Sequence, residues 1–179
     1  MIKLILILVL TLSFNVFSKE DKKIESKESI ISHIISSSNK KGVDPALSLA
    51  VATVESNFNP KAIRYEPKYA TYSVGIFQLF YPTAKAMGFV GDIKKLQSPK
   101  VNIALGIEHL SMCYDPSKTI AQMACCYNAG VNVKESVCLK NKGIKKYVAK
   151  ISKQYEIWYA ILMYRLPFMD AHNDLVTLI

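Results

Sequence analysis

The sequence lacks the features that mark several common protein classes. It has three histidines, and because His33 and His109 are isolated and the cysteine spacings match no ligand pattern, a zinc site is not expected. It has no internal repeat, which excludes a solenoid, and no convincing strand-like alternation. Acidic residues (14) are fewer than basic ones (23), yet no nucleic-acid-binding motif accompanies the net charge of +9. Such a charge suits an anionic surface, or serves solubility alone.

The N-terminus has the pattern of an export signal. Lys3 precedes an apolar run over 4–16, small residues stand at Val16 and Ser18, and a charged segment follows. This pattern predicts a signal peptide over 1–18, cleaved after Ser18, and places the protein in the periplasm or outside the cell. The run is short for a membrane span, which needs about 20 residues, and it ends without a cysteine for a lipid anchor. Cleavage would remove only Lys3 from the charge and leave +8.

Four cysteines in an exported chain permit two disulfides. Cys125 and Cys126 are adjacent and can hardly pair with each other, so Cys113 and Cys138 are the natural partners. The pairing itself stays open. The alternative is that some of these residues are buried thiols, since a free cysteine packs as a small hydrophobe.

The segment 44–60 organises the chain. Asp44 and Pro45 form an N-cap and a first helical residue, and the residues up to Asn59 are almost all apolar. A helix that is hydrophobic nearly all round is a buried helix. Glu55 stands at its C-terminal end, where burial and the partial negative charge of the helix end both raise the pKa of a carboxyl. Glu55 is therefore a candidate general acid; the alternative is that it leaves the core and meets water.

The rest of the chain reads as one mainly α domain of six or seven helices. A flexible lead is expected over 19–28, the domain over 29–164, and a tail without clear signal over 165–179. Residues 59–74 read as a loop or a short irregular hairpin. The other helices are expected at 29–40, 82–87, 98–113, 119–127 and 144–164.

Four short motifs occur in a fixed order, followed by a Tyr-Val pair. They are ESNFNP at 55–60, GIFQL at 75–79, NIALG at 102–106 with His109-Leu110 after it, CYNAG at 126–130, and Tyr147-Val148. Together they resemble the lytic transglycosylases of the lysozyme-like fold, which are related to goose-type lysozymes. The resemblance covers about residues 40–155. Phe77 and Cys126 depart from the usual Met and Ala, and the link between Glu55 and Gly75 is longer than in the commonest members, so a sugar-contacting Ser cannot be placed.

The resemblance implies an enzyme that cleaves the β-1,4 bond between N-acetylmuramic acid and N-acetylglucosamine in peptidoglycan glycan strands. Glu55 would act as acid and then as base, giving a 1,6-anhydro product without a cofactor or metal. No second carboxylate of comparable burial is obvious, because Glu66, Asp92, Glu108 and Asp115 all have polar surroundings. Substrate assistance by the N-acetyl group removes the need for one.

The resemblance also implies a substrate-binding set around Glu55. Gln78 would bond sugar or backbone, Tyr127 and Asn128 would orient the N-acetyl group, and Tyr147 would reach Glu55 or that group. Phe77 would supply an apolar wall that keeps the acid dry. Ser56 completes the set.

Two other functions stay open. A goose-type muramidase would use water in place of the 6-hydroxyl, and a noncatalytic wall-binding or secretion-apparatus protein would use the same scaffold. We expect a monomer that does not bind nucleic acid. The sequence leaves open whether the protein remodels the wall, serves a secretion or conjugation apparatus, or lyses a target.

Overall fold

The structure, a computed structural model, describes residues 26–138 and 140–164. The predicted signal peptide, most of the lead and the tail lie outside this part. The helices are α2 (Lys27–Lys41), α3 (Pro45–Ser56), α4 (Tyr81–Ala86), α5 (Ile93–Leu96), α6 (Pro99–Ser111), α7 (Ile120–Ala129), α8 (Glu135–Cys138) and α9 (Lys142–Tyr164). The strands are β1 (Ile63–Glu66), β2 (Thr71–Val74) and β3 (Leu79–Phe80), with a 3-10 helix at Pro67–Tyr69. The mainly α prediction is confirmed.

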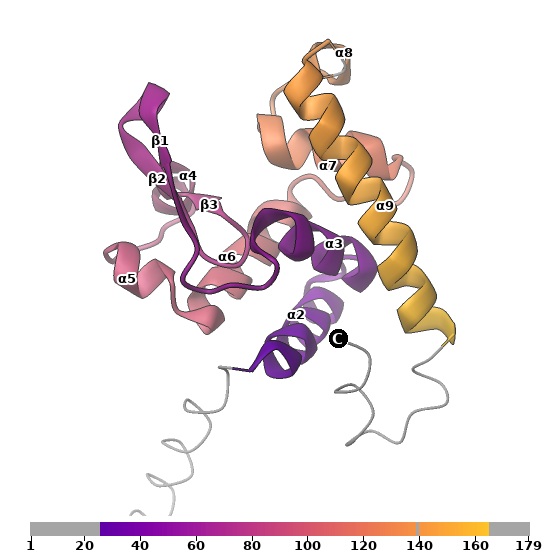
Figure 1. The fold of residues 1–179 in the computed structure, drawn as a ribbon, viewed down its shortest axis with the longest axis horizontal. Helices are drawn as coiled ribbons and strands as arrows, with labels where there is room; N and C mark the ends of the chain where they lie inside the picture. The colour runs from indigo at the N-terminus through magenta and orange to yellow at the C-terminus, as the bar shows by residue number, and fades with distance from the viewer. Residues whose placement is uncertain (1–25, 139, 165–179) are drawn as a thin grey trace, which may run out of the picture.

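Helix α3 lies at the centre, with the β1–β2 hairpin on one side and α7 and α9 on the other (Figure 1). Its start is as predicted, because the Asp44 carboxylate accepts a hydrogen bond of 2.8 Å from the N–H of Ala46. Every residue from Ala46 to Ala52 is buried. The apolar composition of this helix therefore makes it the core around which the others pack.

Helix α9 crosses α3 and fixes it through two polar contacts. The Tyr155 hydroxyl donates to Asp44, and the Trp158 indole N–H donates to the Thr53 hydroxyl, each over 2.8 Å. Since the two helices are distant in sequence, these bonds fix both ends of α3 relative to α9.

The segment 59–74, expected as a loop or a short irregular hairpin, contains a hairpin. Residues 63–66 and 71–74 form an antiparallel hairpin with Arg64 opposite Ser73, and β3 pairs with β2 as a third strand. The strands are only two to four residues long, and most of β1 is exposed, so an apolar–polar alternation barely develops. The alternative of a short hairpin was the better interpretation.

The cysteines form two disulfides, Cys113–Cys126 and Cys125–Cys138. Each member of the adjacent pair is thus joined to one of the two outer cysteines. The bridges link the end of α6 to α7, and α7 to α8. They fix α7 next to the cleft described below. Within the described ranges, no helix is long and apolar enough to span a membrane.

Asn102 is a buried polar residue that binds the turn at 75–79 to helix α6. Its amide N–H groups donate to the carbonyls of Val74 (2.9 Å) and Leu96 (3.0 Å), and its oxygen accepts from the N–H of Phe77 (2.9 Å). Gly75, at φ +76°, passes so close that a Cβ there would lie 2.3 Å from the Asn102 amide nitrogen. The asparagine therefore supplies three hydrogen bonds that the buried backbone would otherwise lack.

Replacing Asn102 should test this role. We expect Asn102→Ala to lower the free energy of unfolding by about 3 kcal/mol or more, because it leaves three buried backbone groups unpaired. Urea unfolding with the disulfides intact measures the change. Asn132→Ala, at an exposed position, is the control and should change stability by less than about 0.5 kcal/mol. Equal stability of the two variants would contradict this role for Asn102.

Candidate active site

The C-terminal end of α3 places Glu55 at the edge of a cleft. The helix ends at Ser56, and the next two residues, Asn57 and Phe58, have left-handed backbone at φ 52° and 65°. This conformation is unfavourable for a phenylalanine. It is offset by burial, since Phe58 is 3% exposed and packs edge-on against Trp158, with ring centroids 5.7 Å apart. The chain therefore turns sharply after Ser56, and Glu55 stays in the last helical turn.

Glu55 is half-buried and has one side-chain partner within the described residues. The Tyr147 hydroxyl, from α9, donates a hydrogen bond of 2.8 Å to Oε1. Burial raises the pKa of Glu55 to about 7, against the lowering effects of the Tyr147 bond and the nearby Arg64 charge; Glu66 adds a smaller raising effect. Because Oε1 accepts from Tyr147, the proton of the neutral acid belongs on Oε2. Glu55 thus holds a transferable proton near neutral pH.

A cavity of about 390 Å³ opens in front of this acid. Its volume is in the range of small-molecule sites. One side is formed by the hairpin and the 75–80 segment, and the other by the ends of α6 and α7. Its lining consists of Glu55, Arg64, Glu66, Tyr69, Ser73, Gln78, Leu79, Phe80, Thr83, His109, Tyr127, Asn128, Ala129 and Gly130.

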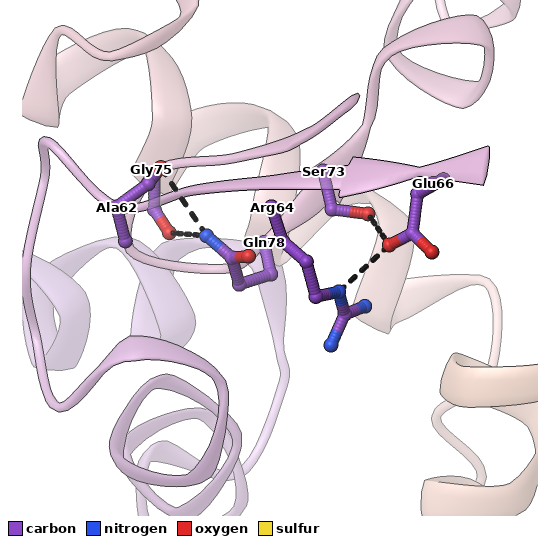
Figure 2. A network of polar contacts seen from close by, with 6 residues as sticks. All are labelled: Ala62, Arg64, Glu66, Ser73, Gly75 and Gln78. Carbon is purple, nitrogen blue, oxygen red and sulfur yellow. Dashed lines mark hydrogen bonds and ion pairs between the residues drawn. The ribbon is translucent and has the colours of Figure 1, made fainter. Parts of the chain in front are cut away.

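Gln78 lies in the cavity wall with its amide turned toward the backbone. Its Nε2 donates to the carbonyls of Gly75 (2.9 Å) and Ala62 (3.3 Å), as Figure 2 shows. Gln78 itself has left-handed backbone, with φ 43°. Since both amide hydrogens are used in holding the base of the hairpin, the side-chain oxygen is the group left for a ligand.

Tyr127 and His109 form the opposite side of the cavity. The rings lie 4.8 Å apart, and the Tyr127 hydroxyl donates to the carbonyl of Phe77 over 2.8 Å. Burial lowers the pKa of His109, so its imidazole is neutral at pH 7. Tyr127 therefore connects α7 to the turn at 75–79, and the exposed Asn128 beside it lines the cavity.

The predicted residues divide into two groups. Glu55, Gln78, Tyr127 and Asn128 line the cavity. Tyr147, Ser56 and Phe77 are not part of this lining, and they contact the residues and backbone that form it. The Ser56 hydroxyl donates to the carbonyl of Ile76 over 2.8 Å, and accepts from the N–H of Asn59. Ser56 thus joins the end of α3 to the turn at 75–79.

Phe77 has a structural position rather than one in the cavity wall. Its side chain is fully buried and packs on Gly106, where an added Cβ would lie 2.3 Å from the ring. The glycine of the NIALG motif therefore leaves room for Phe77 under the turn. On the hairpin side of the cavity, the aromatic lining comes instead from Tyr69 and Phe80, whose ring centroids are 5.2 Å apart.

Sequence reasoning did not include the polar residues of the hairpin in the site. The sequence left the sugar-contacting Ser unplaced, and Glu66 was counted among the carboxylates with polar surroundings; Arg64, Ser73 and Glu66 were not assigned to the site. All three line the cavity. The signal that could have found them is the spacing of Arg64 and Glu66, which puts both on one face of a strand. Within residues 26–138 and 140–164, no group of three His, Cys, Asp or Glu side chains could hold a metal ion.

The burial of Glu55 predicts a pH-dependent cost in stability. The folded protein keeps a proton up to about pH 7, whereas the unfolded chain releases it near 4.5. The free energy of unfolding is therefore highest, as far as Glu55 is concerned, below about pH 4. It falls as the pH rises from there through about 7, by about 3 kcal/mol in all. We expect Glu55→Gln, which has no charge to bury, to be more stable than the wild type by up to that amount at about pH 8.

Denaturant unfolding of both proteins at about pH 4 and at about pH 8 measures this difference. Glu108→Gln is the matched control, because Glu108 is exposed and pairs with Lys41 on the surface. It should change stability by less than about 1 kcal/mol at either pH. A Glu55→Gln effect that is the same at low and high pH would contradict the assignment.

Comparison with known proteins identifies the family and the fold. The model of the Transglycosylase SLT domain family matches residues 32–150. No curated protein matches the chain. Among solved structures, the fold is similar to lytic transglycosylase Slt from Pseudomonas aeruginosa, in an inactive mutant with glutamate replaced by glutamine; the TM-score is 0.60 at 18% identity, over 84% of this chain. The chain spans about a quarter (26%) of that protein. This chain belongs to the transglycosylase SLT domain family.

Proposed function

We propose that this protein is an exported lytic transglycosylase that cleaves peptidoglycan glycan strands, with Glu55 as its acid and base. The observation that carries the proposal is a half-buried carboxyl, with a pKa of about 7, in the wall of a cleft of sugar size. The family assignment supports the substrate class. The inactive mutant of the structural neighbour, a glutamate-to-glutamine change, fits a glutamate-dependent reaction in that protein.

The reaction needs one proton donor. Glu55 Oε2 donates its proton to the glycosidic oxygen, and the bond from that oxygen to C1 of the muramic acid breaks. The N-acetyl oxygen of the same sugar takes up the positive charge at C1. Ionised Glu55 then accepts the proton of the 6-hydroxyl, whose oxygen bonds to C1 and displaces the N-acetyl oxygen. The product is a 1,6-anhydro sugar, and Glu55 ends protonated as it began.

The surrounding residues suit these steps. Tyr147 holds Oε1, which keeps the carboxyl in one orientation while Oε2 exchanges the proton. The exposed Tyr69 ring offers an apolar face to a sugar, and the Gln78 oxygen and the Asn128 amide offer hydrogen bonds to its hydroxyl and N-acetyl groups. The net charge of +9 favours approach to an anionic wall polymer.

Export is part of the proposal. Peptidoglycan lies outside the cytoplasm, and the N-terminal 18 residues have the pattern of a signal peptide. The two disulfides support an oxidising compartment, where such bonds form and persist.

A muramidase activity is the second candidate, and one observation favours it. Glu66, a second carboxylate, lines the same cavity as Glu55. Many glycosidases that transfer the sugar to water use two carboxyl groups. A hydrolysed product is heavier than the anhydro product by one water, so mass spectrometry of the released fragments separates the two reactions.

Glu55→Gln should abolish cleavage. The amide cannot donate an acidic proton or accept one, so we expect release of muropeptides from purified cell wall to fall by about 10³-fold or more. Mass spectrometry of the soluble fragments measures both the amount and the anhydro end of the wild-type product. Glu108→Gln should release fragments at the wild-type rate. Undiminished release by Glu55→Gln would remove Glu55 from the mechanism.

The pH dependence of the rate should follow the Glu55 proton. The protonated acid is the active form and its pKa is about 7, so the rate should be high below pH 7 and fall above it. Initial rates on soluble glycan fragments between about pH 5 and pH 9 measure this decline. A rate that increases through pH 7 would show that the ionised form starts the reaction, contrary to the proposed order.

A further inference from the structure

The hairpin has two chemically distinct faces. In the β1–β2 register, Arg64 lies opposite Ser73, and Tyr65 lies opposite Tyr72. Arg64, Ser73 and Glu66 line the cavity, whereas the Tyr65 and Tyr72 rings contact each other with centroids 5.2 Å apart. Since successive side chains of a strand point to opposite faces, the register places a polar group of three residues in the cleft.

Glu66 is held firmly within this group. Its Oε1 accepts from the Ser73 hydroxyl over 2.7 Å and from Arg64 Nε over 2.8 Å, as Figure 2 shows. The Ser73 bond, with a further contribution from Arg64, lowers the pKa of Glu66 from its usual value. The carboxylate is therefore ionised at neutral pH and is oriented by two donors.

The geometry leaves one oxygen of Glu66 for a ligand. Both hydrogen bonds of this carboxylate within residues 26–138 and 140–164 involve Oε1. Its side chain is 25% exposed and lines the cavity, so the carboxylate is accessible to a ligand. An ordinary surface ion pair would need only Arg64. Glu66 in addition accepts a hydrogen bond from Ser73 and lines the cavity.

Glu55 and Glu66 line one cavity from different elements, helix α3 and strand β1. One is an acid that keeps its proton, and the other is an anion. Two carboxyl groups whose environments act on them in opposite directions are the usual arrangement of a proton donor and a charge stabiliser in glycoside cleavage.

We propose that Glu66 is a second catalytic carboxylate, whose Oε2 faces the sugar and stabilises the positive charge that develops at C1 as the glycosidic bond breaks. This inference rests on the proposed function and deepens it. Glu66 forms no covalent bond and transfers no proton; it acts through its charge. Ser73 and Arg64 are positioning residues that fix Oε1.

The test is the steady-state kinetics of Glu66→Gln on soluble peptidoglycan fragments of defined length. The amide keeps the shape of the side chain and loses the charge, so we expect kcat to fall by about 10²-fold with KM nearly unchanged. Ser73→Ala, which keeps the charge but frees Oε1, should lower kcat by a smaller factor. Glu108→Gln removes a negative charge outside the cavity and should have wild-type kcat.

The alternatives give different results. A Glu66→Gln variant with wild-type kcat, or with a raised KM alone, overturns the proposal, because the charge would then act only in binding or not at all. Circular dichroism confirms the fold; if Glu66→Gln does not fold, Glu66→Asp, which withdraws the charge by one methylene, must show the loss in kcat. An inactive Glu55→Gln beside a fully active Glu66→Gln refutes this inference alone, whereas a wild-type protein that releases no fragments refutes the proposed function.

Discussion

The site depends on one carboxyl that is withdrawn from water and held by a single hydroxyl. Burial at the end of a helix favours the neutral form of Glu55, and the Tyr147 bond limits that effect while it fixes the orientation of the group. Both residues sit on helices that pack against each other, α3 and α9. The contacts of Tyr155 and Trp158 with α3 therefore also support the site, because they hold α9 against α3 and so keep Tyr147 within hydrogen-bond distance of Glu55.

The other wall of the cleft is built around the turn at 75–79. Asn102 accepts a hydrogen bond from the backbone of this turn, and Gly106 leaves room for Phe77. Ser56 and Tyr127 each donate a hydrogen bond to one carbonyl of the turn. Residues that the family resemblance places near the sugar thus hold the backbone that carries Gln78. Each of these contacts joins segments at least 20 residues apart in the sequence, so the shape of the cleft is a property of the assembled core.

The sequence predicted the helices well because their limits are set locally. Asp44-Pro45 begins α3 through a cap of 2.8 Å, and Gly42 ends α2 in left-handed backbone. The ordered motifs also pointed to Glu55, Gln78, Tyr127 and Asn128, which the structure brings into one cavity. Glu66 was missed. The spacing of Arg64 and Glu66 shows that they share one face of a strand, but whether that face turns toward the cavity depends on how the hairpin packs. The positions of Phe77 and Ser56 behind the lining were not predicted either, because a motif gives the order of residues and not the direction of their side chains.

The proposed reaction depends on the proton of Glu55, and a titration of that carboxyl tests it most directly. With ¹³C-labelled glutamate, and Glu55→Gln to assign the signal, the chemical shift of the side-chain carboxyl carbon can be followed against pH in the folded protein. We expect a midpoint of about pH 7. A midpoint near the ordinary 4.5 would show that Glu55 is ionised at neutral pH, and would contradict its role as the acid.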